Sequence, residues 1–162
     1  MKFKIFTYSF LVSVSLWSCF PAYNAYPKEY RSAKADFSKQ KVYVVNKELE
    51  KEFKILKHSG IYEIAEDSTN TAKIKLYPMT THTPSCGNPM IGSMMTVGLL
   101  PAVFPYDNAY SYDVIENHTT KNYQFNLRVN QSLWLFNIFR LHKTYAKQSG
   151  KALLGNYISS NK

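Results

Sequence analysis

The sequence contains only two cysteines, Cys19 and Cys86. A framework of several disulfides is therefore excluded, and one Cys19–Cys86 bond is the most that the chain can form within itself. Cys86 follows His82 by four residues, but neither has further ligands at the spacing that a zinc site requires. A cysteine hydrolase would need an imidazole beside Cys86, which folding would have to bring from His82, His118 or His142. Because no spacing demands a thiolate here, we expect no metal, no cofactor and no catalytic role for Cys86.

Acidic side chains are absent from the last part of the chain. Residues 117–162 contain seven Lys and Arg but no Asp or Glu, whereas residues 19–116 contain eleven basic and eleven acidic side chains. An excess of one sign indicates an oppositely charged partner. Lipid headgroups or envelope polymers suit an exported protein better than nucleic acid, for which the sequence carries no recognition motif.

Apolar runs long enough to cross a membrane are also absent. The three longest apolar stretches are residues 5–17, 90–105 and 133–141. Each is shorter than the roughly 20 residues that a spanning helix needs. The first follows Lys2 and Lys4, and this order is typical of a secretory signal peptide. The second is interrupted by glycine and proline, and we expect it to pack in the core or on a bilayer surface.

The end of the first stretch, residues 16–19 (Leu-Trp-Ser-Cys), resembles the bacterial lipobox. The resemblance implies that residues 1–18 are a signal peptide and that the mature chain begins at Cys19, which carries lipid. It also implies sorting to the outer membrane, since Phe20 and not Asp follows the cysteine. Two alternatives remain open: an ordinary cleaved signal peptide and an uncleaved anchor.

Residues 20–40 are rich in Tyr, Lys, Ala and Pro and show no sustained period. We interpret residues 19–40 as a lipidated tether that holds the folded part away from its anchor. The remaining residues, 41–162, are expected to form a single α+β domain.

The first half of this domain has a β-α-β-β pattern. Residues 41–45 predict a strand, and the following apolar stripe predicts a helix that begins at Asn46 and ends at Gly60. Residues 61–66 and 72–77 predict two strands joined as an antiparallel hairpin.

A second hairpin is predicted from residues 110–114 and 123–129, which alternate between apolar and polar side chains. Gln124, Asn126 and Arg128 are expected to face outward. The sheet is therefore expected to be small and antiparallel or mixed, with one or two C-terminal helices after it.

Residues 133–141 are apolar on every side of a helical wheel. A helix of this kind is either buried on the sheet or placed in a membrane interface. A strand is the competing interpretation, because a short apolar run does not reveal its period. The membrane interpretation predicts a contact set of aromatic and basic residues: Trp134, Phe136, Phe139, Arg140, Lys143, Lys147 and Lys151.

The lipobox, the turn at residues 96–101 before the tyrosine-rich hairpin and the apolar segment containing Trp134 together resemble small lipoproteins of Gram-negative envelopes. The resemblance implies an envelope location and a non-enzymatic role, without any substrate or named partner. The partners that we expect are the membrane, through a lipid anchor and anionic headgroups, and another envelope protein, with no nucleic acid and no small-molecule substrate. Three hypotheses therefore remain. They are a lipid-anchored binding or scaffolding protein, a soluble exported binder or inhibitor with a Cys19–Cys86 disulfide, and a hydrolase that uses Cys86.

Overall fold

The computed structural model describes residues 20–68, 71–82, 88, 90–96, 100–117 and 119–161. Cys19, Cys86 and His118 lie outside these described residues. The lipid-attachment, disulfide and cysteine-hydrolase hypotheses therefore stay predictions.

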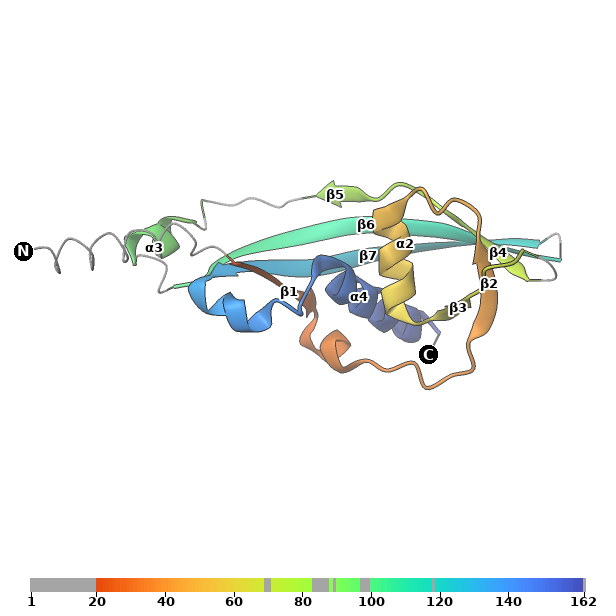
Figure 1. Ribbon diagram of the computed structural model, residues 1–162, viewed down its shortest axis with the longest axis horizontal. Helices are drawn as coiled ribbons and strands as arrows, with labels where there is room; N and C mark the ends of the chain where they lie inside the picture. The colour runs from red at the N-terminus through yellow and green to blue at the C-terminus, as the bar shows by residue number, and fades with distance from the viewer. Residues whose placement is uncertain are drawn as a thin grey trace, which may run out of the picture.

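The predicted α+β fold with a mixed sheet is confirmed (Figure 1). The strands are β1 (Phe20–Tyr26), β2 (Gln40–Val44), β3 (Tyr62–Ile64), β4 (Ala72–Leu76), β5 (Thr80–His82), β6 (Ala102–Glu116) and β7 (Thr119–Trp134). They form one sheet in the order β1-β7-β6-β4-β2-β3, and β5 also pairs with β6. The helices are η1 (Lys28–Ser32), α2 (Glu50–Ser59), α3 (Met90–Met95), η2 (Leu135–Arg140) and α4 (Tyr145–Ser160), of which η1 and η2 are 3₁₀ helices.

The β6–β7 hairpin runs along the length of the molecule, as Figure 1 shows. Its register continues without a break from Ala102 opposite Leu133 to Glu116 opposite Thr119. Asn117 begins the turn with φ of 46°, a conformation that asparagine tolerates better than most residues. The predicted second hairpin is therefore confirmed, with longer strands than the sequence pattern indicated.

The side chains of this hairpin alternate as predicted. Tyr110, Tyr112 and Leu127 are almost completely buried beneath the helices, whereas Gln124 and Asn126 are exposed on the other face. Buried and partly buried rings from several elements pack edge-on, stacked or tilted at centroid distances of 5.3–6.3 Å; they belong to Tyr62, Tyr110, Tyr112, Tyr123, Phe125 and Tyr157. This aromatic group forms the core between the hairpin and α4.

The β-α-β-β order of the first half is confirmed, but the hairpin predicted between its last two strands is wrong. Both β3 and β4 pair with β2 in parallel, one on each side of it. The α2 crossover returns the chain parallel to β2, as such connections do. Strand β2 therefore lies between two partners, and its Val42 and Val44 are fully buried.

Asn46 does not cap α2, which begins only at Glu50. Its Nδ2 donates to the carbonyl of Leu76 and its Oδ1 accepts from the Leu76 N–H, both at 2.8 Å. The amide side chain thus adds one more step to the β2–β4 ladder. The predicted end of the helix is confirmed, because Gly60 follows it in the left-handed conformation.

We expect Asn46→Ala to lower the free energy of unfolding by about 1–3 kcal/mol, because both backbone groups of Leu76 lose their partners. Urea unfolding followed by circular dichroism measures this. The matched control is Asn126→Ala on the exposed face of β7, which should unfold as the parent does. Equal midpoints for the two variants would show that the Asn46 bridge contributes nothing.

The tether predicted for residues 19–40 is wrong for residues 20–32, which belong to the fold. Strand β1 pairs with β7 over all seven of its residues, and Ala22 and Ala25 are fully buried. The Ala25 N–H also donates to Oε1 of Gln148 in α4, at 3.1 Å. Alanines carry little hydrophobic pattern, and the strand is defined by its hydrogen bonds to a distant part of the chain.

Helices α2 and α4 cross on one face of the sheet and close the core. The core includes Val42, Ile55, Ile74, Leu127 and Leu153, all fully buried. Among the described residues, this core draws its buried side chains from Ala25 to Leu154. No helix within the described ranges is both long and apolar enough to cross a bilayer.

Candidate functional site

Three segments meet at one end of the β6–β7 hairpin, opposite the turn at Asn117. Helix α3 comes shortly before β6, η2 follows directly after β7, and β1 begins at Phe20, which is paired with Trp134. Figure 1 shows α3, η2 and the start of β1 at this same end. The register of the hairpin thus gathers residues from three distant parts of the sequence.

Most of the exposed large apolar side chains among the described residues lie at this end. We call the group the apolar end; its members are Ile91, Met94, Met95, Leu100, Val103, Phe136, Ile138, Phe139 and Leu141. Elsewhere the described chain exposes only Tyr26, Phe37 and Val45 in this way. Nine residues gathered at one end form a larger apolar surface than the single exposed side chains that soluble proteins usually carry.

Helix η2 buries its polar side chain and exposes its apolar ones, which is the reverse of an ordinary surface helix. Its polar residue Asn137 is fully buried, while the exposed fraction is 45% for Phe136 and 79% for Phe139. The Asn137 Nδ2 donates to the carbonyls of Phe20, at 3.0 Å, and Ser132, at 2.7 Å. One amide therefore fixes η2 to β1 and β7 and turns its apolar side chains away from the protein.

Residues 133–141 are consequently neither the predicted α-helix nor a core segment. Leu133 and Trp134 end strand β7, and η2 follows with Phe136, Ile138 and Phe139 exposed. The strand interpretation holds for the first two residues only. Trp134 is half-buried and packs its ring edge-on against Phe136, with the centroids 4.9 Å apart.

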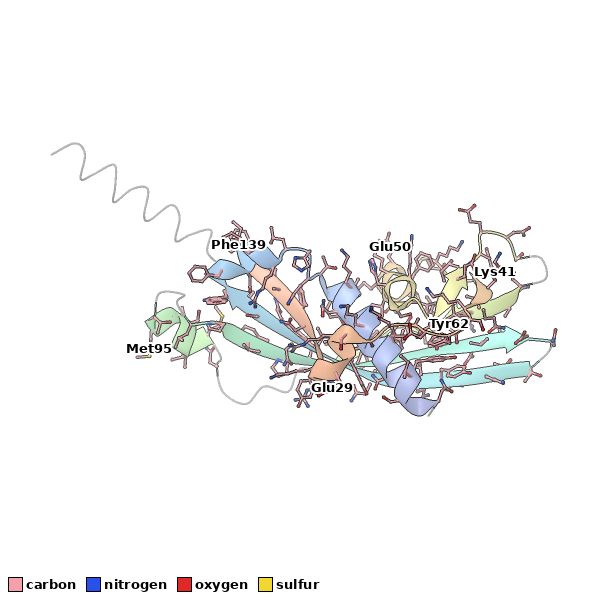
Figure 2. All side chains as sticks on the ribbon, turned by 90° about the horizontal axis from the view of Figure 1, so that it is seen from below. Glu29, Lys41, Glu50, Tyr62, Met95 and Phe139 are labelled. Atoms are coloured by element: carbon pink, nitrogen blue, oxygen red, sulfur yellow. The ribbon has the colours of Figure 1, made fainter. Side chains whose placement is uncertain are left out.

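Basic side chains lie beside η2. Burial lowers the pKa of Lys143, and three neighbouring cations lower it further: Arg140, Arg31 and Lys151. Figure 2 shows Phe139 and Met95 at the same end of the molecule. The apolar end is therefore bordered by positive charge on the η2 side.

The predicted contact residues are not all equally available. Arg140 and Lys147 are exposed, whereas Lys151 is half-buried and donates from Nζ to the carbonyl of Arg31 at 2.6 Å. Lys143 donates from Nζ to Oδ1 of Asn24 at 3.2 Å. Lys143 and Lys151 thus help to hold β1 and η1 in place.

Sequence reasoning missed one part of this site and left a second part open. Arg31 was assigned to the tether, although its Nε donates to the Ala25 carbonyl at 2.9 Å and its charge adds to the basic group. For residues 90–105, which contain α3, the sequence leaves core packing and bilayer-surface packing open, because an apolar stretch gives no sign of whether another element covers it.

A hollow of about 370 Å³ lies on the helix-covered face, and three tyrosines line much of it. The ring of Tyr23 meets that of Tyr145 edge-on at 5.5 Å, and Tyr106 donates to Oε1 of Gln131 at 2.8 Å. Burial raises the pKa of both Tyr23 and Tyr145, so these phenols stay neutral at physiological pH. This hollow therefore offers apolar contact and hydrogen bonds to a ligand.

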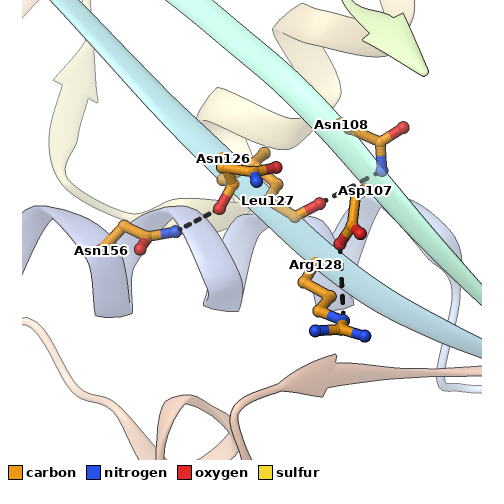
Figure 3. A network of polar contacts seen from close by, with 6 residues as sticks. All are labelled: Asp107, Asn108, Asn126, Leu127, Arg128 and Asn156. Carbon is orange, nitrogen blue, oxygen red and sulfur yellow. Dashed lines mark hydrogen bonds and ion pairs between the residues drawn. The ribbon is translucent and has the colours of Figure 1, made fainter. Parts of the chain in front are cut away.

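A second hollow contains His82, one of the predicted histidine candidates, with Asp107 and Ser111. Figure 3 shows that Asp107 faces Arg128, with 3.5 Å between Oδ1 and Nε. Within the described ranges no hydrogen bond links His82, Asp107 and Ser111, so they do not form a proton relay. His142 is exposed after η2, on a different element. The described part of the chain also contains no group of three potential metal ligands.

Comparison with known proteins gives only distant similarities. No family model matches the chain, and no curated protein matches it. Among solved structures, the rare lipoprotein B from Shewanella oneidensis is 9% identical with a TM-score of 0.40, covering 76% of this chain and 96% of that one. A minor lipoprotein from Acinetobacter baumannii is 8% identical with a TM-score of 0.35, covering 77% and 91%. Similarities this weak carry no conclusion about the function of this chain.

Proposed function

We propose that this chain is a lipid-anchored protein of the cell envelope that lies against the membrane through its apolar end and binds or scaffolds another envelope component. The observation that carries the proposal is the inverted η2, which buries Asn137 and exposes Phe136, Ile138 and Phe139. Exposed aromatic side chains bordered by cations suit the headgroup boundary of a bilayer.

The position of Phe20 joins this surface to the lipid expected on Cys19. Asn137 holds the Phe20 carbonyl at 3.0 Å, so the described chain begins beside η2. Consecutive Cα atoms are about 3.8 Å apart, and a lipid on Cys19 would therefore enter the bilayer next to the apolar end. Anchor and surface would then act on the same side of the molecule.

The energies expected for such contact are sufficient to orient the domain. Transfer of one large apolar side chain from water contributes about 1.5–3 kcal/mol when complete. Each basic residue near an anionic surface adds roughly 1 kcal/mol, which salt reduces. Arg140 and Lys147 are the exposed cations available for this, and the lipid would provide most of the retention.

The unlipidated chain from Phe20 onward is expected to bind vesicles that contain anionic lipid. Trp134 is the only tryptophan after residue 19, so its fluorescence reports on the apolar end directly. Replacing Phe136 and Phe139 together by serine should weaken binding at least tenfold, since roughly 1.4 kcal/mol corresponds to a factor of ten. Binding is measured by vesicle sedimentation and by the blue shift of the Trp134 emission.

The matched control is Phe37→Ser, because Phe37 is also exposed, at 37%, but packs on Tyr157 away from this end. It should bind vesicles as the parent does. Arg140→Glu with Lys147→Glu should weaken binding at low salt. An unlipidated chain that ignores anionic vesicles at low salt would overturn the membrane-contact part of the proposal.

A further inference from the structure

We infer that α3 is a second membrane-inserting element, separate from η2. The two helices together would keep the long axis of the β6–β7 hairpin pointing away from the bilayer surface. The inference rests on the proposed function, since it needs a membrane at the apolar end. It adds an interaction surface in a part of the chain for which the sequence had indicated either core or surface packing.

The side chains of α3 are as exposed as those of η2. The exposed fraction is 55% for Ile91, 71% for Met94 and 81% for Met95. A Cβ added to Gly92 would meet nothing within 4 Å, so this face of the helix has open space around it. Methionine is unbranched and flexible, and it adapts to an irregular apolar surface such as lipid.

The polar groups at the end of α3 are satisfied locally. The Thr96 hydroxyl donates to the Gly92 carbonyl at 2.9 Å and accepts from the Leu100 N–H at 3.1 Å. At its beginning, the Met90 N–H donates to Oδ1 of Asn88 at 3.0 Å. A segment that satisfies its own donors and acceptors enters an apolar medium at lower cost than one that needs water.

Charge distribution distinguishes α3 from η2. Residues 76–106 contain no Asp, Glu, Lys or Arg, so α3 has no charge to desolvate. The basic group that borders η2 has no counterpart in this stretch. Insertion of α3 should therefore respond little to salt, whereas contact through the η2 side should weaken as salt rises.

The two helices are placed to fix an orientation. One precedes β6 and the other follows β7, and Figure 2 labels Met95 and Phe139 at the same end but apart from each other. Two separated contacts prevent the domain from tilting about either one. Strand β6 has 15 residues, and at about 3.3 Å per residue the turn at Asn117 would stand roughly 45 Å from the bilayer surface.

The test places an environment-sensitive fluorophore on the chain from Phe20 onward, which contains the whole core. In a Cys86→Ser background, Met94→Cys is labelled with a nitrobenzoxadiazole dye and mixed with phosphatidylcholine–phosphatidylglycerol vesicles. We expect a blue shift and a several-fold gain in intensity that persist at raised salt. The matched control is Gln124→Cys, at an exposed position of β7 away from the apolar end. The emission of the dye at this position should stay that of a dye in water.

Trp134 emission, read on the same samples, separates failure of this inference from failure of the proposed function. If the Trp134 emission shifts but the dye at Met94 responds no more than the dye at Gln124, the inference is overturned and the proposed function stands. No response at either position overturns both, and a response of the Gln124 dye equal to that at Met94 overturns the upright orientation. In unlabelled protein, Met94→Ser with Met95→Ser should reduce vesicle affinity about tenfold or more, as expected when two thioether side chains that are partly buried in lipid are lost. Unchanged affinity would also overturn the inference.

Discussion

The substitution Gly150→Ala is expected to destabilise the fold although it adds only one methyl group. Gly150 lies where α4 crosses α2, and a Cβ there would be 2.7 Å from the carbonyl carbon of His58 and 2.8 Å from the backbone nitrogen of Ser59. These atoms belong to a helix backbone and cannot rotate away as a side chain can. The two helices would have to separate.

Two effects compete in this variant. Alanine improves helix propensity over glycine by about 1 kcal/mol. Overpacking typically costs about 1–3 kcal/mol, and against backbone the upper part of that range applies. We therefore expect Gly150→Ala to lower the free energy of unfolding by about 1–2 kcal/mol. The bulkier Gly150→Val should prevent stable folding, because domains have only about 5–15 kcal/mol in total.

Urea unfolding of the chain from Phe20 onward measures this effect. Gly92→Ala is the control, because it makes the same change in a helix where nothing lies within 4 Å of the added Cβ. It should leave the unfolding midpoint unchanged or raise it slightly, because only the gain in helix propensity applies there. If Gly150→Ala is as stable as the parent, the close approach of α2 and α4 is not as described.

Replacement of Cys19 by alanine is expected to have the largest effect on the protein in the cell. The order of basic residues, apolar run and lipobox-like residues 16–19 predicts that Cys19 carries the lipid. Without it, the exposed side chains of the apolar end would have to retain the protein by themselves. Even one acyl chain gives only marginal, reversible binding, with an association constant of about 10⁴ M⁻¹, and the apolar end should do no better.

Metabolic labelling with palmitate and fractionation of the envelope measure this change. The Cys19→Ala chain should lose the label and move from the membrane fraction to the soluble exported fraction. Cys86→Ser is the control and should keep both the label and the location. Label that persists in Cys19→Ala would contradict the prediction. A mature parent chain whose mass shows no lipid on Cys19 and a disulfide to Cys86 would favour the soluble alternative.

Local patterns were sufficient for part of the fold. The β6–β7 hairpin was predicted because its strands alternate over many residues, so that a single register buries one face. The end of α2 at Gly60 was predicted because a left-handed residue leaves a recognisable signal. Both features depend on residues that are close together in the sequence.

Long-range pairing was not predictable in the same way. Strand β1 has alanines where most strands have large β-branched side chains, and its partner is more than one hundred residues away. Strand β2 lies between β3 and β4. The sequences of these three strands permit other pairings as well, so they do not reveal which strand is central. Asn46 looked like a helix cap because its side chain suits that role equally well.

The candidate site was predicted in part. The sequence names Phe136, Phe139, Arg140 and Lys147 as contact residues but leaves open whether the apolar run is exposed or buried on the sheet, because that depends on whether another element covers it. Asn137 decides that outcome, and its role requires the Phe20 carbonyl from the opposite end of the chain. Only folding brings these two groups together.

The pairing of β1 with β7 also determines how the domain would respond to a pulling force. All seven residues of β1 are paired with β7, and the chain enters the strand at Phe20, at the apolar end. A force applied through the N-terminus would act along the strand axis, so the hydrogen bonds would be loaded together in shear and would not open one after another. Such a strand yields only when most of its bonds fail at once. The strand that replaces the expected tether would therefore make the connection between anchor and fold mechanically resistant, and tension on the domain would pass directly into the sheet.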